Sequence, residues 1–120
     1  STYFWSALYV NSITYYGSLT NASDARLKEN IEDIDLGLDF INELSPKKYN
    51  YISDENKKIR YGLIAQEVEP KVESNVAMVN KDNDEMGTYG IDYVQLIPIL
   101  IKSVQELSAK VEALESLLNS

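Results

Sequence analysis

Residues 97–118, IPILIKSVQELSAKVEALESLL, carry the pattern that decides the C-terminal architecture. Their apolar positions follow one another at alternating steps of three and four residues. These positions are Ile97, Leu100, Val104, Leu107, Val111, Leu114 and Leu118. Such steps give a mean period of about 3.5 residues, which is the heptad repeat of a left-handed coiled coil. The stretch therefore predicts a long helix over residues 94–120 with a coiled-coil seam along one side.

The number of helices that meet at this seam is left open by the pattern. In heptad terms, the a positions are Ile97, Val104, Val111 and Leu118, and the d positions are Leu100, Leu107 and Leu114. Mostly β-branched residues at a with leucine at d favour two helices in a parallel coil. Ile101 and Leu117 flank the seam and widen the apolar stripe towards a higher-order assembly. A single amphipathic helix lying on its own domain would show the same spacing. Dimer, trimer and intramolecular packing all remain compatible with the sequence.

Two helical patterns are expected ahead of this helix. Leu38, Ile41 and Leu44 stand at helical spacing before Pro46, so a short helix is predicted near residues 35–44. The segment AQEVEP, residues 65–70, predicts a second short helix that ends near its proline.

Two hairpins are also expected in this part of the chain. Residues 49–51 and 59–64 read as extended runs on either side of the turn SDENKK. Residues 76–80 and 87–93 flank the turn KDNDE in the same way. The predicted fold class is α+β, with short helices and hairpins followed by one long C-terminal helix.

The first 23 residues differ sharply from the rest. They contain no Asp, Glu, Lys or Arg, whereas all 11 basic and 19 acidic residues come later. They also hold Tyr3, Phe4, Trp5, Tyr9, Tyr15 and Tyr16 among otherwise small, polar or β-branched residues. Such a composition indicates extended β structure or the end of a fibrous stalk. We expect a domain boundary between residues 1–22 and 23–120.

The amino-acid composition and net charge of the whole chain exclude several classes of function. The chain has no cysteine and no histidine, which rules out disulfides, thiolate zinc sites, cysteine nucleophiles and histidine bases. A net charge of −8 argues against nucleic acid as a partner. No apolar run is long enough to span a membrane. Asp82, Asp84 and Glu85 suggest a calcium loop, but they lack the frame of an EF-hand, so no metal or cofactor is expected.

One short constellation, ASDARLKENI at residues 22–31, lies on the compositional boundary. A serine nucleophile needs a base at neutral pH, and in a chain without histidine a lysine is the natural substitute. Ser23 and Lys28 are five residues apart and fit that pairing. On spacing alone, an N-capping serine beside a surface lysine is the favoured explanation of the pair.

Four sequence segments, which follow one another in a fixed order, extend the comparison to most of the chain. They are SDARLKENI, LSPKKYNY, IRYGLIAQEVEP and YGIDYVQLIPILIKSVQEL, between Ser23 and about Leu107. This arrangement resembles the C-terminal intramolecular chaperone and auto-processing domain of phage tailspikes, tail fibres and neck appendages. The same family includes endosialidase tailspikes and the myelin regulatory factor group. Residues 1–22 then correspond by position to the end of the fibre.

The resemblance implies a homotrimer that nucleates assembly of a β-rich stalk and then cuts itself off. It assigns Ser23 as the nucleophile, Lys28 as the base and Ala22–Ser23 as the scissile bond. It implies no cofactor and no membrane, with the fibre segment of its own chain as the partner. The expected location is the virion, reached after folding in the host cytoplasm. A non-enzymatic trimerisation module, a coiled-coil adaptor and a transcription-factor release domain are the alternatives.

Overall fold

A computed structural model describes residues 9–120 of the chain. By its internal contacts the chain divides into two units, residues 1–33 and 34–120. The expected boundary at Ala22–Ser23 thus lies inside the first unit, and as a functional boundary it stays a prediction. Unit 2 contains α1 (Leu38–Asn42), β1 (Lys47–Tyr49), β2 (Arg60–Gly62), α2 (Ala65–Val68), β3 (Val79–Lys81), β4 (Tyr89–Ile91) and α3 (Leu96–Leu118). This order of short helices, hairpins and a long terminal helix confirms the predicted α+β class.

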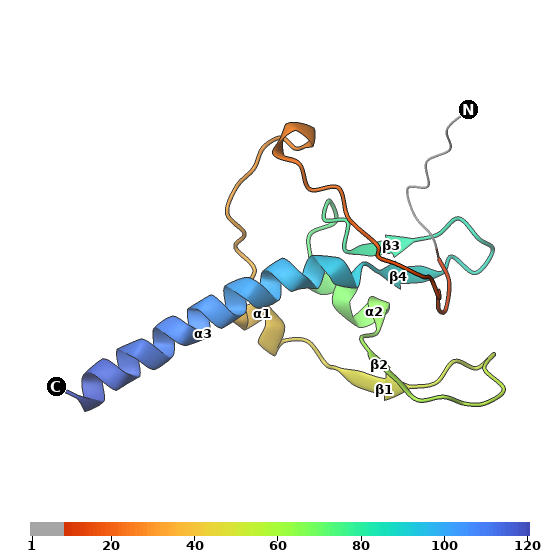
Figure 1. Ribbon diagram of the computed structural model, residues 1–120. Helices are drawn as coiled ribbons and strands as arrows, with labels where there is room; N and C mark the ends of the chain where they lie inside the picture. Colours follow the sequence, from red (N-terminus) through yellow and green to blue (C-terminus); the bar gives the residue numbers. More distant parts are fainter. Residues whose placement is uncertain (1–8) are drawn as a thin grey trace. The chain divides into compact units, whose positions relative to one another are not determined.

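The long helix forms where the heptad pattern predicts it. α3 runs for 23 residues from Leu96 to Leu118 (Figure 1). A 3-10 turn, Tyr93–Gln95, leads into it, and the Asp92 carboxylate caps this turn by accepting the Val94 N–H at 3.2 Å. Pro98 falls in the first turn of α3, where its missing N–H removes no helical hydrogen bond.

The helix predicted near residues 35–44 is α1, shortened to a little over one turn. Gly37 precedes it and provides no side-chain cap. Its first N–H group, on Leu38, is satisfied instead by the carboxylate of Glu106 on α3, at 3.1 Å. A Cβ atom on Gly37 would lie 1.7 Å from that carboxylate oxygen, so a glycine allows the close approach. The contact holds α1 against α3.

Both expected hairpins form as antiparallel pairs of short strands. β1 pairs with β2 in a register that sets Lys48 opposite Tyr61. β3 pairs with β4 in a register that sets Asn80 opposite Gly90. The two sheets remain separate, so each hairpin depends on contacts with the rest of unit 2 for its stability. One such contact is Tyr93, whose hydroxyl oxygen accepts the N–H of Leu63 just after β2, at 2.8 Å.

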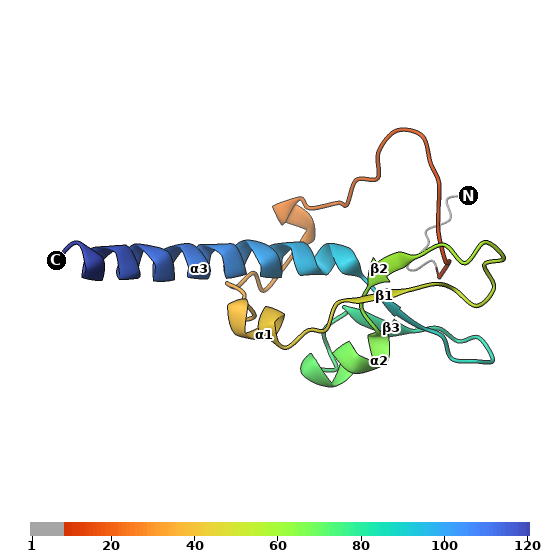
Figure 2. The ribbon, with the colours of Figure 1, turned by 90° about the horizontal axis from the view of Figure 1, so that it is seen from below.

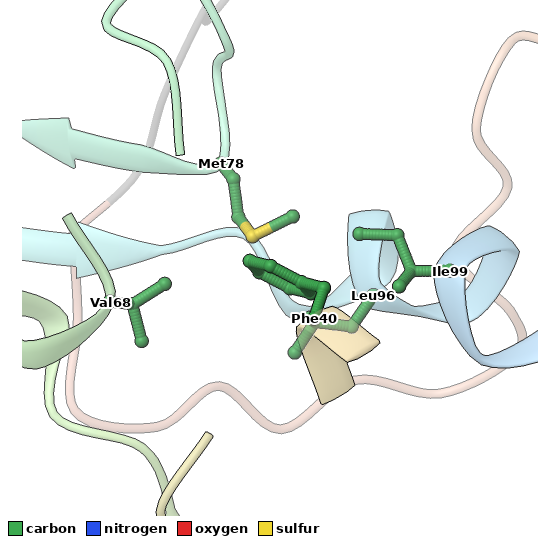
Figure 3. Close-up of a cluster of buried hydrophobic side chains, with 5 residues drawn as sticks. All are labelled: Phe40, Val68, Met78, Leu96 and Ile99. Atoms are coloured by element: carbon green, nitrogen blue, oxygen red, sulfur yellow. The ribbon is translucent and has the colours of Figure 1, made fainter. Parts of the chain in front are cut away.

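A small apolar core joins these elements. Its buried members are Phe40, Val68, Met78, Leu96 and Ile99. Figure 3 shows Phe40 of α1 at the centre of this group, with Met78, Leu96 and Ile99 around it. Met78 and Ile99 are each only 1% exposed. Phe40 is the most buried side chain of α1, and Ile41 and Leu44 are partly buried against the same core.

The C-terminal half of α3 extends beyond this core. α3 buries Leu96, Ile99 and Ser103 against unit 2. Every residue from Val104 to Ser120 is exposed. Figures 1 and 2 show this half of the helix passing α1 with no other element of unit 2 beside it. The helix therefore belongs to its own domain at one end and lacks a partner from that domain at the other.

The described part of unit 1 contains one short element, the 3-10 turn η1 (Ala25–Leu27). Residues 9–22 form no strand in the single chain, so the expected β structure stays a prediction for an assembled fibre. Residues 1–8, which hold part of the aromatic stretch, lie outside the described residues. Among the residues that are described, no helix is both long and apolar enough to cross a membrane.

Candidate active site

Ser23 and Lys28 lie side by side. The Lys28 Nζ donates a hydrogen bond to the Ser23 Oγ at 2.6 Å. This separation is within the range in which a base can take a proton from a hydroxyl group. Both side chains are exposed in the single chain. The two residues that the sequence singles out are therefore in contact, next to the Ala22–Ser23 bond.

A capped turn brings the lysine back towards the serine. Asp24 is the N-cap of η1, and its carboxylate accepts the backbone N–H of Arg26 at 2.9 Å. The turn is closed by backbone bonds from Leu27 N to the Asp24 carbonyl at 3.0 Å and from Lys28 N to the Ala25 carbonyl at 3.2 Å. One turn of 3-10 helix advances about 6 Å, which a lysine side chain can span. The contact is thus made across a single local turn of the chain.

The chain continues past Lys28 through a sharp change of direction. Asn30 adopts a φ of 53°, in the left-handed region. Asparagine tolerates this region better than most residues with a side chain. Asn30 therefore shapes the backbone after the turn. Within residues 9–120, its side chain makes no hydrogen bond with Ser23 or Lys28.

Asp24 and Arg26 form an ion pair next to the dyad. The Arg26 Nη2 donates to one carboxylate oxygen of Asp24 at 2.7 Å, and its Nε donates to the other at 3.1 Å. This hydrogen bonding from the Arg26 side chain, and then from its backbone N–H, lowers the pKa of Asp24. The Asp24 carboxylate in turn raises the pKa of Arg26. The carboxylate beside Ser23 is thus ionised and already occupied.

The residues of the predicted seam lie along the unpartnered part of α3 and its beginning. They are Ile97, Leu100, Val104, Leu107, Val111, Leu114 and Leu118, with exposed fractions from 45% at Val111 to 85% at Leu118. Ile101 and Leu117, which widen the stripe, are also exposed. The intramolecular alternative, in which this face packs on its own domain, does not describe the structure of the single chain. Unit 2 uses a different set of α3 residues for its core.

The acidic turn between β3 and β4 is a hydrogen-bonded hairpin turn. The Asp84 carboxylate accepts the N–H of Thr88 at 2.7 Å and also a hydrogen bond from the Thr88 hydroxyl. The Thr88 hydroxyl, and then the Thr88 N–H, lower the pKa of Asp84. Asp82 caps the turn by accepting the Asn83 N–H at 2.8 Å. Among the described residues no group of three or more acidic side chains is arranged to hold a metal ion.

Two residues of consequence carry no assigned role in the sequence analysis. One is Arg26. Its position two residues after an N-capping aspartate is the sequence feature that indicates its contact with Asp24. Glu106 is the other, and no local pattern links it to Leu38, because 68 residues separate them. The first contact is readable from neighbouring residues, whereas the second depends on how α1 packs on α3.

Comparison with known proteins agrees with the motif. Residues 23–77 match the family model described as "chaperone of endosialidase", of the peptidase S74 group, and the match begins at Ser23. The chain is also similar to a probable tail fiber protein of Escherichia phage Phieco32, with 33% identity over 104 residues. The alignment covers 85% of this chain but only 14% of the phage protein.

These matches agree with the resemblance seen in the ordered sequence blocks, and the hairpins and long helix agree with the expected fold. The contact between Ser23 and Lys28 lies at the start of the matched region. Residues 23–77 of the chain therefore belong to the chaperone-of-endosialidase family.

Proposed function

We propose that residues 23–120 act as an intramolecular chaperone that trimerises a phage tail fibre or related appendage and then cuts the Ala22–Ser23 bond. Ser23 is the nucleophile and Lys28 is the general base. The observation that carries the proposal is the 2.6 Å contact between the Lys28 Nζ and the Ser23 Oγ, directly after the bond to be cut. The family match from Ser23 onwards supports it independently.

The reaction begins with neutral Lys28, which takes the proton from the Ser23 hydroxyl. The Ser23 oxygen then attacks the Ala22 carbonyl carbon through a five-membered ring. The bond from that carbon to the Ser23 nitrogen breaks, and the nitrogen takes the proton back from Lys28. The product is an ester between Ala22 and the Ser23 oxygen. Water hydrolyses this ester and leaves a carboxylate on Ala22 and a free hydroxyl on Ser23.

Proximity provides much of the acceleration. The attacking oxygen and the carbonyl belong to adjacent residues, so no substrate has to be captured. Well-oriented intramolecular reactions reach effective molarities on the order of 10⁵ M, or roughly 7 kcal/mol of the barrier. Direct hydrolysis, with Lys28 activating water, is the competing route. Hydroxylamine distinguishes the two routes, because it converts the ester into a hydroxamate on Ala22.

Assembly is the step that the C-terminal helix supports. A β-rich trimeric stalk joins chains through non-local contacts that form slowly and misregister easily. A terminal domain that trimerises first fixes the register and raises the local concentration of the stalk ends. The exposed heptad seam of α3 supports this role. Within residues 9–120 this apolar helical face is left exposed, and such a face is typical of a surface that binds another chain. Cutting then removes the helper and makes the assembly kinetically irreversible.

This function places the protein in the virion as part of a fibre precursor that folds in the host cytoplasm. The phage relative is named as a probable tail fiber protein, which supports that location. The partners are two further copies of the chain and the fibre segment that precedes Ser23. We expect a fibre chain that ends at Ala22 to aggregate, and the same chain followed by residues 23–120 to give trimers.

Intact and native mass spectrometry test the cleavage on the whole chain. The wild type should give a trimeric species and two fragments that end at Ala22 and begin at Ser23. Ser23→Ala and Lys28→Ala should trimerise and stay uncut. The matched controls are Ser18→Ala and Lys58→Ala, which change exposed residues of the same types. Wild-type trimers that remain uncut would leave the non-enzymatic trimerisation module as the function, and a monomer bound to another protein would indicate an adaptor.

A further inference from the structure

The carboxylate that follows Ser23 poses a chemical problem for Lys28 in its role as a base. Asp24 follows Ser23 directly in the chain, and its carboxylate is ionised. A carboxylate within about 4–6 Å of an amine typically raises the amine's pKa by about 1–3, which keeps the amine protonated. A protonated lysine cannot accept the proton of Ser23. An unoccupied Asp24 would therefore compete with Ser23 for the lysine and hold it in the inactive form.

The structure shows where the Asp24 carboxylate is engaged. One of its oxygens accepts the Arg26 backbone N–H at 2.9 Å and the Arg26 Nε at 3.1 Å. The other accepts the Nη2 at 2.7 Å and the Nε at 3.3 Å. Both oxygens thus receive two hydrogen bonds from one residue. The Lys28 Nζ donates to the Ser23 Oγ.

Packing does not account for this arrangement. The Arg26 side chain is 87% exposed and the Asp24 side chain is 43% exposed. An exposed ion pair of this kind contributes little to folding stability. The backbone cap of the turn uses the N–H of residue 26, so it does not require the guanidinium group. The turn therefore does not need the guanidinium group, whereas the side-chain hydrogen bonds to the Asp24 carboxylate do.

We infer that Arg26 is a positioning residue for the self-cleavage, because it occupies the Asp24 carboxylate and so leaves Lys28 available to Ser23. The inference rests on the proposed function and assigns a task to a residue outside the dyad. The other carboxylates of the described part of unit 1 are Glu29, Glu32 and Asp33, which are exposed and follow Lys28 in the chain. None of these three precedes or caps the turn.

The test is the pH dependence of cleavage in the full chain. In Arg26→Ala the free Asp24 carboxylate should capture Lys28. Because the pair is exposed, we take the low end of the usual range, about one pH unit towards alkali. Cleavage at neutral pH should then slow about tenfold and recover as the pH rises. Arg26→Lys keeps a positive charge beside Asp24, so its profile should lie between those of wild type and Arg26→Ala.

A second substitution separates this effect from a structural one. Asp24→Asn/Arg26→Ala removes the competing charge and keeps an N-capping side chain, so it should restore the wild-type rate and profile. Glu29→Gln/Arg26→Ala is the matched control, with the same change in net charge, and should remain slow at neutral pH.

Two results would overturn the inference while wild-type cleavage stands. One is an Arg26→Ala chain with the wild-type profile. The other is an Arg26→Ala chain that is slow at every pH and is not restored by Asp24→Asn, which would mean that Arg26 only maintains the turn. A wild-type chain that never cuts overturns the proposed function itself and the inference with it.

Discussion

Glu106 of α3 accepts the backbone N–H of Leu38 at the start of α1, across 68 residues of sequence. The first N–H groups of a helix have no partner within the helix and need one from elsewhere. Gly37, the residue in the N-cap position, has no side chain to offer. The long helix therefore provides the cap for the short one, and the two are stabilised as a pair.

This relationship predicts a modest and shared energetic cost. Glu106→Ala removes the acceptor and should lower the free energy of unfolding by about 1 kcal/mol. Gly37→Ala should have a similar effect, because its Cβ would lie 1.7 Å from the carboxylate oxygen and push the side chain away. Urea denaturation of uncut chains measures both values.

The double substitution gives the sharper comparison. Because both changes break the same hydrogen bond, Glu106→Ala/Gly37→Ala should cost clearly less than the sum of the two single changes. Glu112→Ala, at an exposed position further along α3, is the control and should be near neutral. Full additivity would mean that Gly37 and Glu106 act independently.

The seam of α3 predicts the effect of a charge on assembly. Leu107→Asp places a carboxylate in the middle of the apolar stripe and should convert trimers into monomers, since an unpaired charge buried at the interface is costly. Gln105→Asp introduces the same charge two residues earlier, on the polar face of the helix, and should leave the trimer intact. Sedimentation velocity distinguishes the two states. Equal behaviour of the two variants would show that this face does not join the copies.

The β1–β2 hairpin predicts a loss of stability in alkali. Tyr49 and Tyr51 contact each other edge to face, with ring centroids 5.4 Å apart. The hydrogen bond with Tyr51, followed by burial, raises the pKa of Tyr49 from 10.0 to about 12. A group whose pKa is raised on folding contributes stability that is complete below its unfolded pKa. That contribution is therefore lost as the pH rises from about 10 to about 12.

Urea midpoints across this alkaline range measure the loss. Tyr49→Phe should flatten the decline, because the residue that titrates is gone. Tyr61→Phe is the control on the same hairpin, since Tyr61 is exposed and should change nothing. A Tyr49→Phe chain that declines as steeply as the wild type would assign the alkaline loss to other groups.

Local patterns in the sequence predicted the elements well. The heptad spacing located α3, and the turn segments SDENKK and KDNDE located both hairpins. The reason is that hydrophobic periodicity and turn chemistry act over a few residues. The Ser23–Lys28 contact belongs to the same class, because one capped turn spans it.

Contacts between distant elements were beyond these patterns. Nothing near Leu38 indicates that Glu106 caps it, and nothing near Leu63 indicates that Tyr93 binds its backbone. Such contacts follow from tertiary packing, which periodicity does not encode. The inner position of Phe40, in a helix of five residues, is a further example.

The division of α3 into two sets of residues has a mechanical consequence. Leu96, Ile99 and Ser103 fasten the helix to its own domain, and the seam faces outward on the same rigid rod. In the proposed trimer, the orientation of each domain about the common axis is therefore set by the rotation around α3 between its buried residues and its seam. One residue inserted after Glu106 would rotate the distal seam by about 100°, whereas seven would nearly restore it. The length and register of α3 therefore determine how each domain is oriented relative to the trimer axis.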